Sequence, residues 1–307
     1  MVQGQIDVTA LIRSFMLNAG YDIATVPIIH SCKSLEQLLI DRVASWNLQD
    51  SYTYKMMNKL VAPACAMANM AYNSHPFKAK EMVAVYSLFL LYIDDKSQEM
   101  CEQLGMFQYN FLTRSSFGHP ILEVFSSFLL EMKSQYGMYA WSAIFTSTIE
   151  FIHGCHLETQ LLKAEIPTSA KSFPRFLRFK TGASAAFAHL LFCEPMVPSS
   201  EFLNKYLMAI PDIIDFIDLG NDVLSFYKES VVGCETDTHF MEEAKVREVD
   251  VTSILKMYSS ECLKVRSRIP IILGDEKLTS IFETFVNGYI MFHNTQNRYR
   301  LNELWCQ

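Results

Sequence analysis

The sequence predicts an all-α protein. Only 11 glycines and 10 prolines interrupt its 307 residues, and 50% of the residues are hydrophobic. Apolar residues also recur at helical spacing through long segments. Few turn residues and long periodic segments together indicate helices joined by short connections, and a chain of this length can bury one large core. We therefore expect a single helical domain over residues 1–307.

The first half of the chain contains the segments that should form its central helices. The stretch 82–93 is apolar on every face, and its 12 residues are too few to cross a bilayer, so we expect a buried helix and no membrane span. Leu11, Phe15 and Leu17 indicate a short helix near the N-terminus. Apolar periodicity predicts further helices at 34–47, 50–71, 121–134 and 138–163.

Two adjacent carboxylates, Asp94 and Asp95, directly follow the apolar stretch. Burying them would be costly without a cation, so we expect a metal ion or an arginine beside them. A solvated helix end is the alternative. Glu99 follows, but Gln98 stands where a DDxxD motif would have its last acid.

The second half of the chain continues the helical pattern. We expect Gly182 to break a helix that begins near residue 173, because a glycine inside a helix costs about 1 kcal/mol relative to alanine. Further helices are predicted at 203–229, 251–266 and 278–297. The polar segment 230–250 is predicted to be a mobile loop, placed where a lid would be useful.

The end of the predicted helix 203–229 carries a row of oxygen-bearing side chains. Asn221, Ser225 and Glu229 are spaced at i, i+4 and i+8, which places them on one helical face with Lys228 at its border. An amide, a hydroxyl and a carboxylate are hard oxygen ligands of the kind that suits Mg²⁺ together with phosphate oxygens. An incidental polar stripe on an amphipathic helix is the alternative.

Composition excludes several classes of protein. The formal charge of −7 and the absence of lysine and arginine clusters give no basic surface for nucleic acid. The eight cysteines include no CxxC pair, and residues 1–9 do not resemble a signal peptide, so we expect a reduced, cytoplasmic protein. His153 and His156 flank Cys155 but lack a fourth ligand at the spacing of a zinc site.

Four separated motifs, in order, resemble those of class I terpene cyclases, most closely the trichodiene synthase branch of sesquiterpene cyclases. They are the Asp94–Asp95 pair, FLRFKTG at 176–182, GNDVLSFYKE at 220–229 and NRYRLNE at 297–303. The resemblance runs from about residue 80 to the end of the chain. It implies a helical bundle around an apolar cavity whose mouth holds three Mg²⁺ ions and the substrate diphosphate.

The resemblance also implies roles for individual residues. Asp94 would bridge two Mg²⁺ ions, while Asn221, Ser225 and Glu229 would hold the third. The implied diphosphate ligands are Arg178, Lys228, Arg298 and Tyr299. Asp95 would pair with Arg298 when the site closes. Arg178 would also sense the diphosphate, with Thr181 as linker and the Gly182 carbonyl facing the substrate.

Aromatic and aliphatic side chains on the same helices are candidates for the cavity wall, where ring faces would stabilise a carbocation. They also suit an ordinary core. The candidates are Phe89, Phe151, Phe187, Ile214, Ile217, Tyr289 and Phe292.

The resemblance implies a Mg²⁺-dependent sesquiterpene synthase that acts on farnesyl diphosphate. The alternatives are a chain-elongating prenyltransferase, which carries two Asp-rich motifs, and a non-catalytic helical lipid-binding protein. A homodimer is left open.

Overall fold

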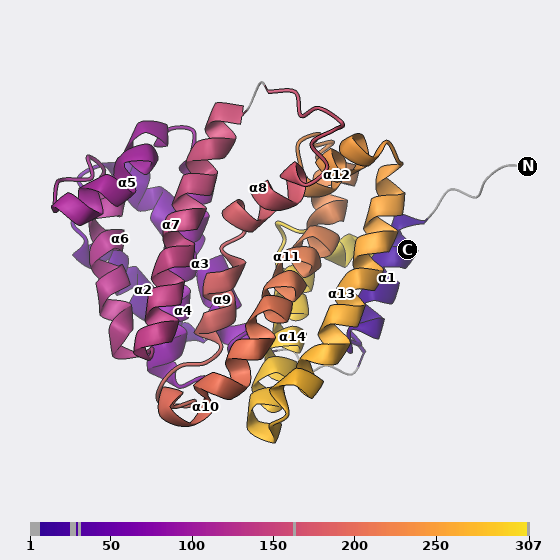
Figure 1. Ribbon diagram of the computed structural model, residues 1–307. Coiled ribbons are helices and arrows are strands. Elements are labelled where there is room, and N and C mark those ends of the chain that lie inside the picture. Colours follow the sequence, from indigo (N-terminus) through magenta and orange to yellow (C-terminus); the bar gives the residue numbers. More distant parts are fainter. Residues whose placement is uncertain (1–6, 25–28, 30–31, 162–163, 306–307) are drawn as a thin grey trace, which may run out of the picture. The chain divides into compact units, whose positions relative to one another are not determined.

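All regular elements that the structure describes are helical, as the sequence predicts (Figure 1). The computed structural model describes residues 7–24, 29, 32–161 and 164–305, and no strand occurs within these ranges. The chain divides into two compact units. Unit 1 comprises Met1–Pro27, Glu165–Phe179 and Lys205–Gln307, and unit 2 comprises Ile28–Ala164 and Lys180–Asn204.

Unit 2 is built around α4 (Phe77–Lys96), in which every residue from 81 to 90 is buried. The buried hydroxyls of Tyr86 and Thr148 lie 2.9 Å apart and join α4 to α7. The Phe89 ring packs between Trp46 and Phe125, with centroid distances of 4.9 and 4.8 Å. The other helices of unit 2 are α2 (Lys33–Ser45), α3 (Ser51–Met70), α5 (Cys101–Thr113), α6 (Pro120–Glu131), the 3-10 turn η1 (Met132–Ser134), α7 (Met138–Leu161) and α9 (Ser184–Leu190).

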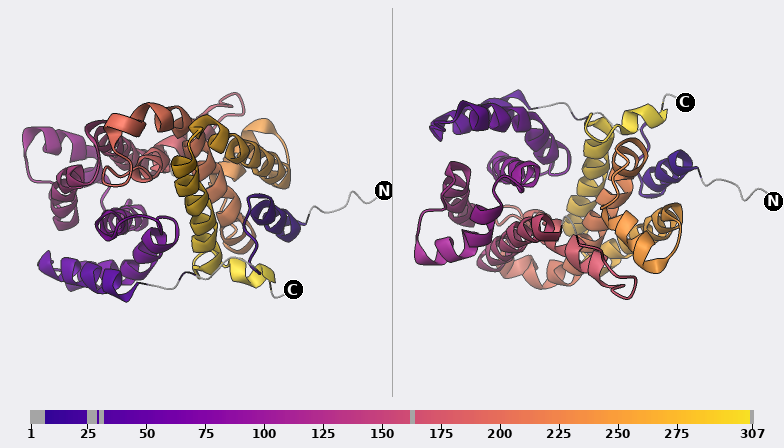
Figure 2. Two further views of the ribbon diagram at one scale, coloured as in Figure 1. Left: turned by 90° about the horizontal axis from the view of Figure 1, so that it is seen from below. Right: turned by 90° about the horizontal axis from the view of Figure 1, so that it is seen from above.

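Unit 1 is built around α11 (Ile210–Phe226), which packs along α13 (Val251–Leu273) and against α14 (Glu276–Thr295). Its core includes the Phe216 ring, which contacts the rings of Phe282, Phe285 and Tyr289. Figure 2 shows α1 (Val8–Asn18) beside α13 in both views. The remaining elements are the 3-10 turn η2 (Leu207–Ala209), the π-helix η3 (Tyr227–Val232), α12 (His239–Arg247) and the 3-10 turn η4 (Leu301–Trp305).

Two helices, α8 (Phe173–Thr181) and α10 (Ser199–Tyr206), each contribute residues to both units. Their starting positions follow from local chemistry. Pro174 lies in the first turn of α8, where its missing N–H is not needed. Ser199 opens α10, and its N–H and Oγ both donate to the Glu194 carboxylate. The turn before α10 is therefore closed by a side chain and not by solvent.

Two predictions about secondary structure are wrong, and one helix forms where none is predicted. The expected single helix 203–229 is divided into α10, η2, α11 and η3. Pro211 has no N–H to bond to the preceding turn and lies in the first turn of α11, which accounts for the break before that helix. The expected loop 230–250 contains α12, whose start is capped by Thr238. Helix α5 occupies a segment for which no element is predicted.

The predictions of reduced cysteines and of no membrane span can be compared with the described residues. The seven cysteines in the described ranges are all free, and the eighth, Cys306, lies outside them. No helix in the described ranges combines the length and apolar character needed to span a membrane.

Candidate active site

The predicted oxygen row lies on α11 and η3 of unit 1. Asn221 and Ser225 belong to the last two turns of α11, and Glu229 belongs to the π-helix that follows. The Ser225 hydroxyl donates a hydrogen bond to Glu229 Oε2 over 2.9 Å, so these two ligand candidates share one face. Lys228 Nζ lies 3.3 Å from Glu229 Oε1. A hydroxyl, a carboxylate and an ammonium therefore meet at the end of α11.

The π-helix changes how the row continues beyond Phe226. In η3 the backbone closes i to i+5 hydrogen bonds, and the Gly233 N–H donates to the Lys228 carbonyl over 2.8 Å. A Cβ on Gly233 would lie 3.0 Å from the carbonyl oxygens of both Lys228 and Glu229, which is tighter than most real contacts. A glycine at position 233 therefore fits the end of the π-helix without a clash. The sequence prediction places Glu229 on the ligand face by α-helical spacing, but the α-helix ends at Phe226.

The Arg178 guanidinium from α8 lies against the same face of α11. Its Nε donates to Asp222 Oδ1 over 2.7 Å, Nη1 lies 3.1 Å from Asp218 Oδ1, and Nη2 donates to Asn221 Oδ1 over 3.3 Å. Burial opposes the charge, but the carboxylates of Asp222 and Asp218 raise the pKa of Arg178 above its ordinary value. A permanent cation thus contacts the amide oxygen predicted to bind metal.

A buried chain of charges extends from Asp222 to α12. The second oxygen of Asp222 accepts a hydrogen bond from His239 Nδ1 over 2.6 Å. His239 Nε2 lies 3.7 Å from Glu243, which accepts a 2.5 Å hydrogen bond from Arg247. Burial opposes the imidazolium, yet the Asp222 carboxylate raises the pKa of His239. Asp222 therefore holds α8 with one oxygen and α12 with the other.

This arrangement predicts a pH-dependent stability. His239 faces Asp222 on α11, Glu243 on its own helix, Arg178 on α8 and the Tyr258 ring on α13. Because the pKa of His239 is higher in the folded protein than in the unfolded chain, protonated His239 stabilises the folded state. This stabilisation is complete below the unfolded-state pKa of about 6.5 and is lost as the pH rises through the folded-state pKa. Urea unfolding between about pH 6 and 9 should show wild type losing stability relative to His239→Gln. Parallel pH profiles of the two proteins would contradict this.

The carboxylates after the apolar stretch lie in unit 2, in the last turn of α4. Asp94 and Asp95 are both exposed, so the argument from the cost of burying them is wrong. The buried charge at this point is Lys96, whose Nζ donates to Glu99 over 2.6 Å and to the Tyr52 hydroxyl. The structure thus gives Glu99 a role as the partner of Lys96.

The predicted helix break lies after Thr181, at the end of α8. The residue with left-handed backbone is Ala183 (φ 50°), one position beyond the predicted Gly182. In unit 2, Gly154 of α7 lies against this turn: a Cβ there would come within 2.7 Å of the Lys180 carbonyl oxygen. Lys180 Nζ also donates to Glu150 of α7 over 2.7 Å. Gly154 therefore permits the close packing that fixes the start of the break.

The predicted C-terminal diphosphate ligands follow α14. The Tyr299 ring packs on His293 with a centroid distance of 4.3 Å and on Phe292 at 5.7 Å. The Arg298 guanidinium lies 5.6 Å from the centre of the Tyr299 ring. Aromatic packing therefore holds Tyr299 in place while Arg298 is only partly buried.

The cavity candidates are distributed over both units and stay predictions. In unit 1, Tyr289 donates its hydroxyl to the Ile217 carbonyl over 3.0 Å, which ties α14 to α11. In unit 2, the Phe187 ring meets Tyr86 edge-on at 5.7 Å. Five of the seven candidates are buried and two are half-buried. The buried ones are Phe89, Phe151, Ile217, Tyr289 and Phe292, and the half-buried ones are Phe187 and Ile214.

Three residues that contact candidate site residues of their own unit are not among the predicted ones. His239 falls in the predicted loop, although Thr238 as a cap, followed by Phe240 and Ala244 at helical spacing, is a signal for α12. Gly154 carries no signal in the sequence, because its role is a close approach to the Lys180 carbonyl 26 residues away. His293 carries no local signal, because its partner Asn221 is 72 residues away.

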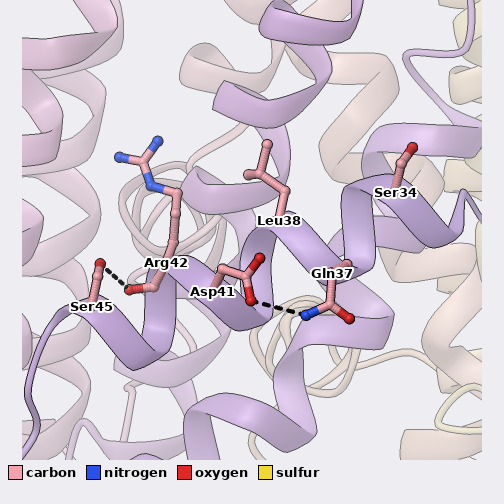
Figure 3. A pocket seen from close by; sticks show the side chains of 6 residues that line it. All are labelled: Ser34, Gln37, Leu38, Asp41, Arg42 and Ser45. Carbon is pink, nitrogen blue, oxygen red and sulfur yellow. Dashed lines mark hydrogen bonds between the residues drawn. The ribbon is translucent and has the colours of Figure 1, made fainter.

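A shallow, open hollow on unit 2 contains none of the predicted site residues (Figure 3). It is lined entirely from α2, and its polar groups are paired: Gln37 donates to Asp41 over 2.9 Å, and Arg42 reaches Glu81 and Glu131 at 2.6 and 2.5 Å. One helical face cannot enclose a ligand, so we assign it no function. Its lining residues are Ser34, Gln37, Leu38, Asp41, Arg42 and Ser45.

Comparison with solved structures agrees with this fold. The linalool/nerolidol synthase from Streptomyces clavuligerus superimposes with a TM-score of 0.59. The match covers 89% of this chain and 98% of that one, at 12% sequence identity. At this level of identity the likeness concerns the fold alone.

Sequence comparison identifies the family. An (E)-beta farnesene synthase of Metarhizium brunneum is 29% identical over 276 residues, which cover 89% of this chain and 83% of the relative. An alpha-cuprenene synthase of Coprinopsis cinerea is 30% identical over 225 residues, 73% of this chain and 67% of the relative. The family model described as Trichodiene synthase (TRI5) matches residues 54–307. The chain therefore belongs to the trichodiene synthase family of terpene synthases.

Proposed function

We propose that this chain is a Mg²⁺-dependent sesquiterpene cyclase that ionises farnesyl diphosphate, cyclises the resulting carbocation and releases diphosphate. The observation that carries the proposal is that three candidate oxygen ligands and two cations lie together along the end of α11 and the start of η3. Ser225 and Glu229 are hydrogen-bonded there, Lys228 lies beside Glu229, and Arg178 donates to Asn221. Family membership and the farnesene synthase among the relatives support the same activity.

The residues on this face fit a Mg²⁺ ion. Their amide, hydroxyl and carboxylate oxygens are hard ligands, and three protein ligands leave the other octahedral positions to diphosphate oxygens and water. The amide oxygen of Asn221 accepts a hydrogen bond from the positively charged Arg178 guanidinium. This oxygen therefore already binds a cationic group. We propose Asn221, Ser225 and Glu229 for one ion and the exposed Asp94 for two others.

The bound ions would neutralise the negative charge that develops on the departing diphosphate. Lys228, Arg298 and Tyr299 are proposed to donate hydrogen bonds to its oxygens, which lowers the barrier to breaking the allylic C–O bond. Arg178 would do the same, and to reach diphosphate it has to exchange some of its contacts with Asp218, Asn221 and Asp222. We further propose that Thr181 and Gly182 couple this exchange to the substrate and that Asp95 pairs with Arg298 on closure.

Incubation with farnesyl diphosphate and Mg²⁺ should yield a sesquiterpene and free diphosphate. The 10- and 20-carbon homologues differ by a whole isoprene unit, so kcat/KM should be at least about 10-fold lower for each, since a single methylene in an apolar pocket can be worth 10-fold or more. Gas chromatography with mass detection identifies the hydrocarbon or alcohol, and a phosphate assay quantifies the diphosphate.

The alternatives give different products in the same experiment. A chain-elongating prenyltransferase supplied with isopentenyl diphosphate would return a longer product that still carries diphosphate. A non-catalytic lipid-binding protein would leave the substrate intact with Mg²⁺ and with a chelator alike. Equal or faster turnover of the 20-carbon substrate would overturn the assignment to farnesyl diphosphate.

A further inference from the structure

A fully buried histidine of α14, His293, contacts Asn221 of α11, one of the proposed Mg²⁺ ligands. His293 is 0% exposed and lies among the aromatic rings of Tyr289, Phe292 and Tyr299, with centroid distances of 4.5, 5.3 and 4.3 Å. Its two ring nitrogens face different partners, the Tyr289 carbonyl at Nδ1 and the Asn221 side chain at Nε2.

These two partners determine which ring nitrogen carries a proton. Nδ1 lies 2.8 Å from the Tyr289 carbonyl oxygen. A carbonyl can only accept, so Nδ1 is the donor. Arg178 can only donate and occupies Asn221 Oδ1, so the Asn221 NH₂ group is left to face Nε2, which is the acceptor of a neutral ring. Nε2 in turn lies 3.1 Å from Asn221 Nδ2. The neutral ring thus presents a lone pair to the Asn221 side chain.

This lone pair fixes the orientation of the Asn221 amide. An asparagine amide is nearly symmetrical in shape, and its hydrogen bonds decide which end is oxygen. With its NH₂ group toward His293, Asn221 turns Oδ1 the other way, where it accepts from Arg178 Nη2. A flipped amide would set Oδ1 against the Nε2 lone pair, and its NH₂ group against the guanidinium, losing both hydrogen bonds.

We propose that His293 is a positioning residue that holds the Asn221 amide with its oxygen toward the metal-binding face of α11. The inference rests on the proposed function, because it assumes that Asn221 binds Mg²⁺. Partners that orient a metal ligand are commonly worth 10- to 100-fold in metal affinity. His293 would act in this way from a helix that carries no predicted metal ligand.

Two variants distinguish the effect of the hydrogen-bond acceptor of His293 from the effect of its ring packing. His293→Phe keeps a ring of similar size in the aromatic cluster but removes the acceptor, and His293→Gln offers an amide oxygen to Asn221 Nδ2. The first should raise the Mg²⁺ concentration for half-maximal binding by about 10-fold or more, while the second stays closer to wild type. His189→Phe is the matched control, because His189 is also a buried histidine but belongs to unit 2.

The readout is thermal stabilisation by Mg²⁺ titrated in the presence of inorganic diphosphate, with the apparent KM for Mg²⁺ and kcat measured alongside. A shift in Mg²⁺ dependence that exceeds the change in kcat at saturating Mg²⁺ supports the inference. Wild-type Mg²⁺ dependence in His293→Phe overturns it. Failure of the wild-type protein to bind Mg²⁺ and diphosphate would instead contradict the proposed function.

A measurement on the unmodified protein avoids any loss of folding in the variants. In protein labelled with ¹⁵N-histidine, long-range ¹H–¹⁵N spectra distinguish the two neutral tautomers, and His293→Gln identifies the resonance. A proton on Nδ1 of His293 at neutral pH is the expected result. A proton on Nε2 would place a donor against the Asn221 NH₂ group and would exclude the proposed orientation.

Discussion

Alanine at Glu229 or Asn221 is expected to lower kcat/KM for farnesyl diphosphate by at least about 100-fold, because each change removes an oxygen ligand where the substrate's leaving group has to be neutralised. The fold should survive. Glu229 is partly exposed and its contact with Lys228 is a surface ion pair of 3.3 Å, which contributes at most about 1 kcal/mol. Steady-state turnover and far-UV circular dichroism measure the two effects separately.

Asp215→Ala is the matched control for both alanine variants. Asp215 is also an acidic residue of α11, but its partner is the exposed Arg175 at 3.2 Å, away from the oxygen row. This variant should keep wild-type turnover. Full activity of Glu229→Ala and Asn221→Ala, or wild-type turnover in the presence of a chelator, would contradict the assignment of this face as a metal site.

The fold could be predicted because the apolar pattern of most helices is contained in a short stretch of sequence. Residues 82–93 of α4 are apolar on every face, which predicts a central helix, and every residue from 81 to 90 is buried. Helix α12 was missed for the opposite reason. Its Glu242, Glu243, Lys245 and Arg247 pair with one another and give it a polar, loop-like composition, while packing of a few side chains such as Phe240 stabilises it.

The candidate site was predictable where its geometry is contained in one helix. Asn221, Ser225 and Glu229 lie within nine consecutive residues, so their spacing along the sequence indicates a shared face. The contacts that orient them are not local. Arg178 is 43 residues from Asn221 and His293 is 72 residues from it, and sequence spacing says nothing about such pairs.

The π-helix η3 marks a second limit of sequence reasoning. Nothing in the letters YKESVV distinguishes a π-turn from an α-turn, since the choice depends on one backbone hydrogen-bond register. Yet the turn decides where Lys228 and Glu229 point relative to Ser225. Single-turn π segments are frequent at functional sites, and in this protein one begins two residues after Ser225, the second predicted metal ligand of α11.

Arg178→Lys is expected to lower turnover by about 100-fold, within the range seen when one preorganised donor to a developing anion is lost. The guanidinium uses three different nitrogens to reach Asp222, Asp218 and Asn221. A lysine ammonium is a single point donor and cannot reproduce this fork, either in the contacts of this structure or on a diphosphate. Incubation with farnesyl diphosphate, followed by product analysis, should show slower turnover and a larger share of uncyclised products.

Arg175→Lys tests whether the loss is specific, because Arg175 lies one turn earlier on α8. Its guanidinium is about half exposed and meets Asp215 and Glu261 at 3.2 and 3.7 Å, distances that a surface lysine can replace at little cost. This variant should keep wild-type rate and products. If Arg178→Lys did the same, the buried contacts with Asp218, Asn221 and Asp222 would serve only to attach α8 to α11. If both variants failed alike, the effect would belong to α8 as a whole and not to the fork of Arg178.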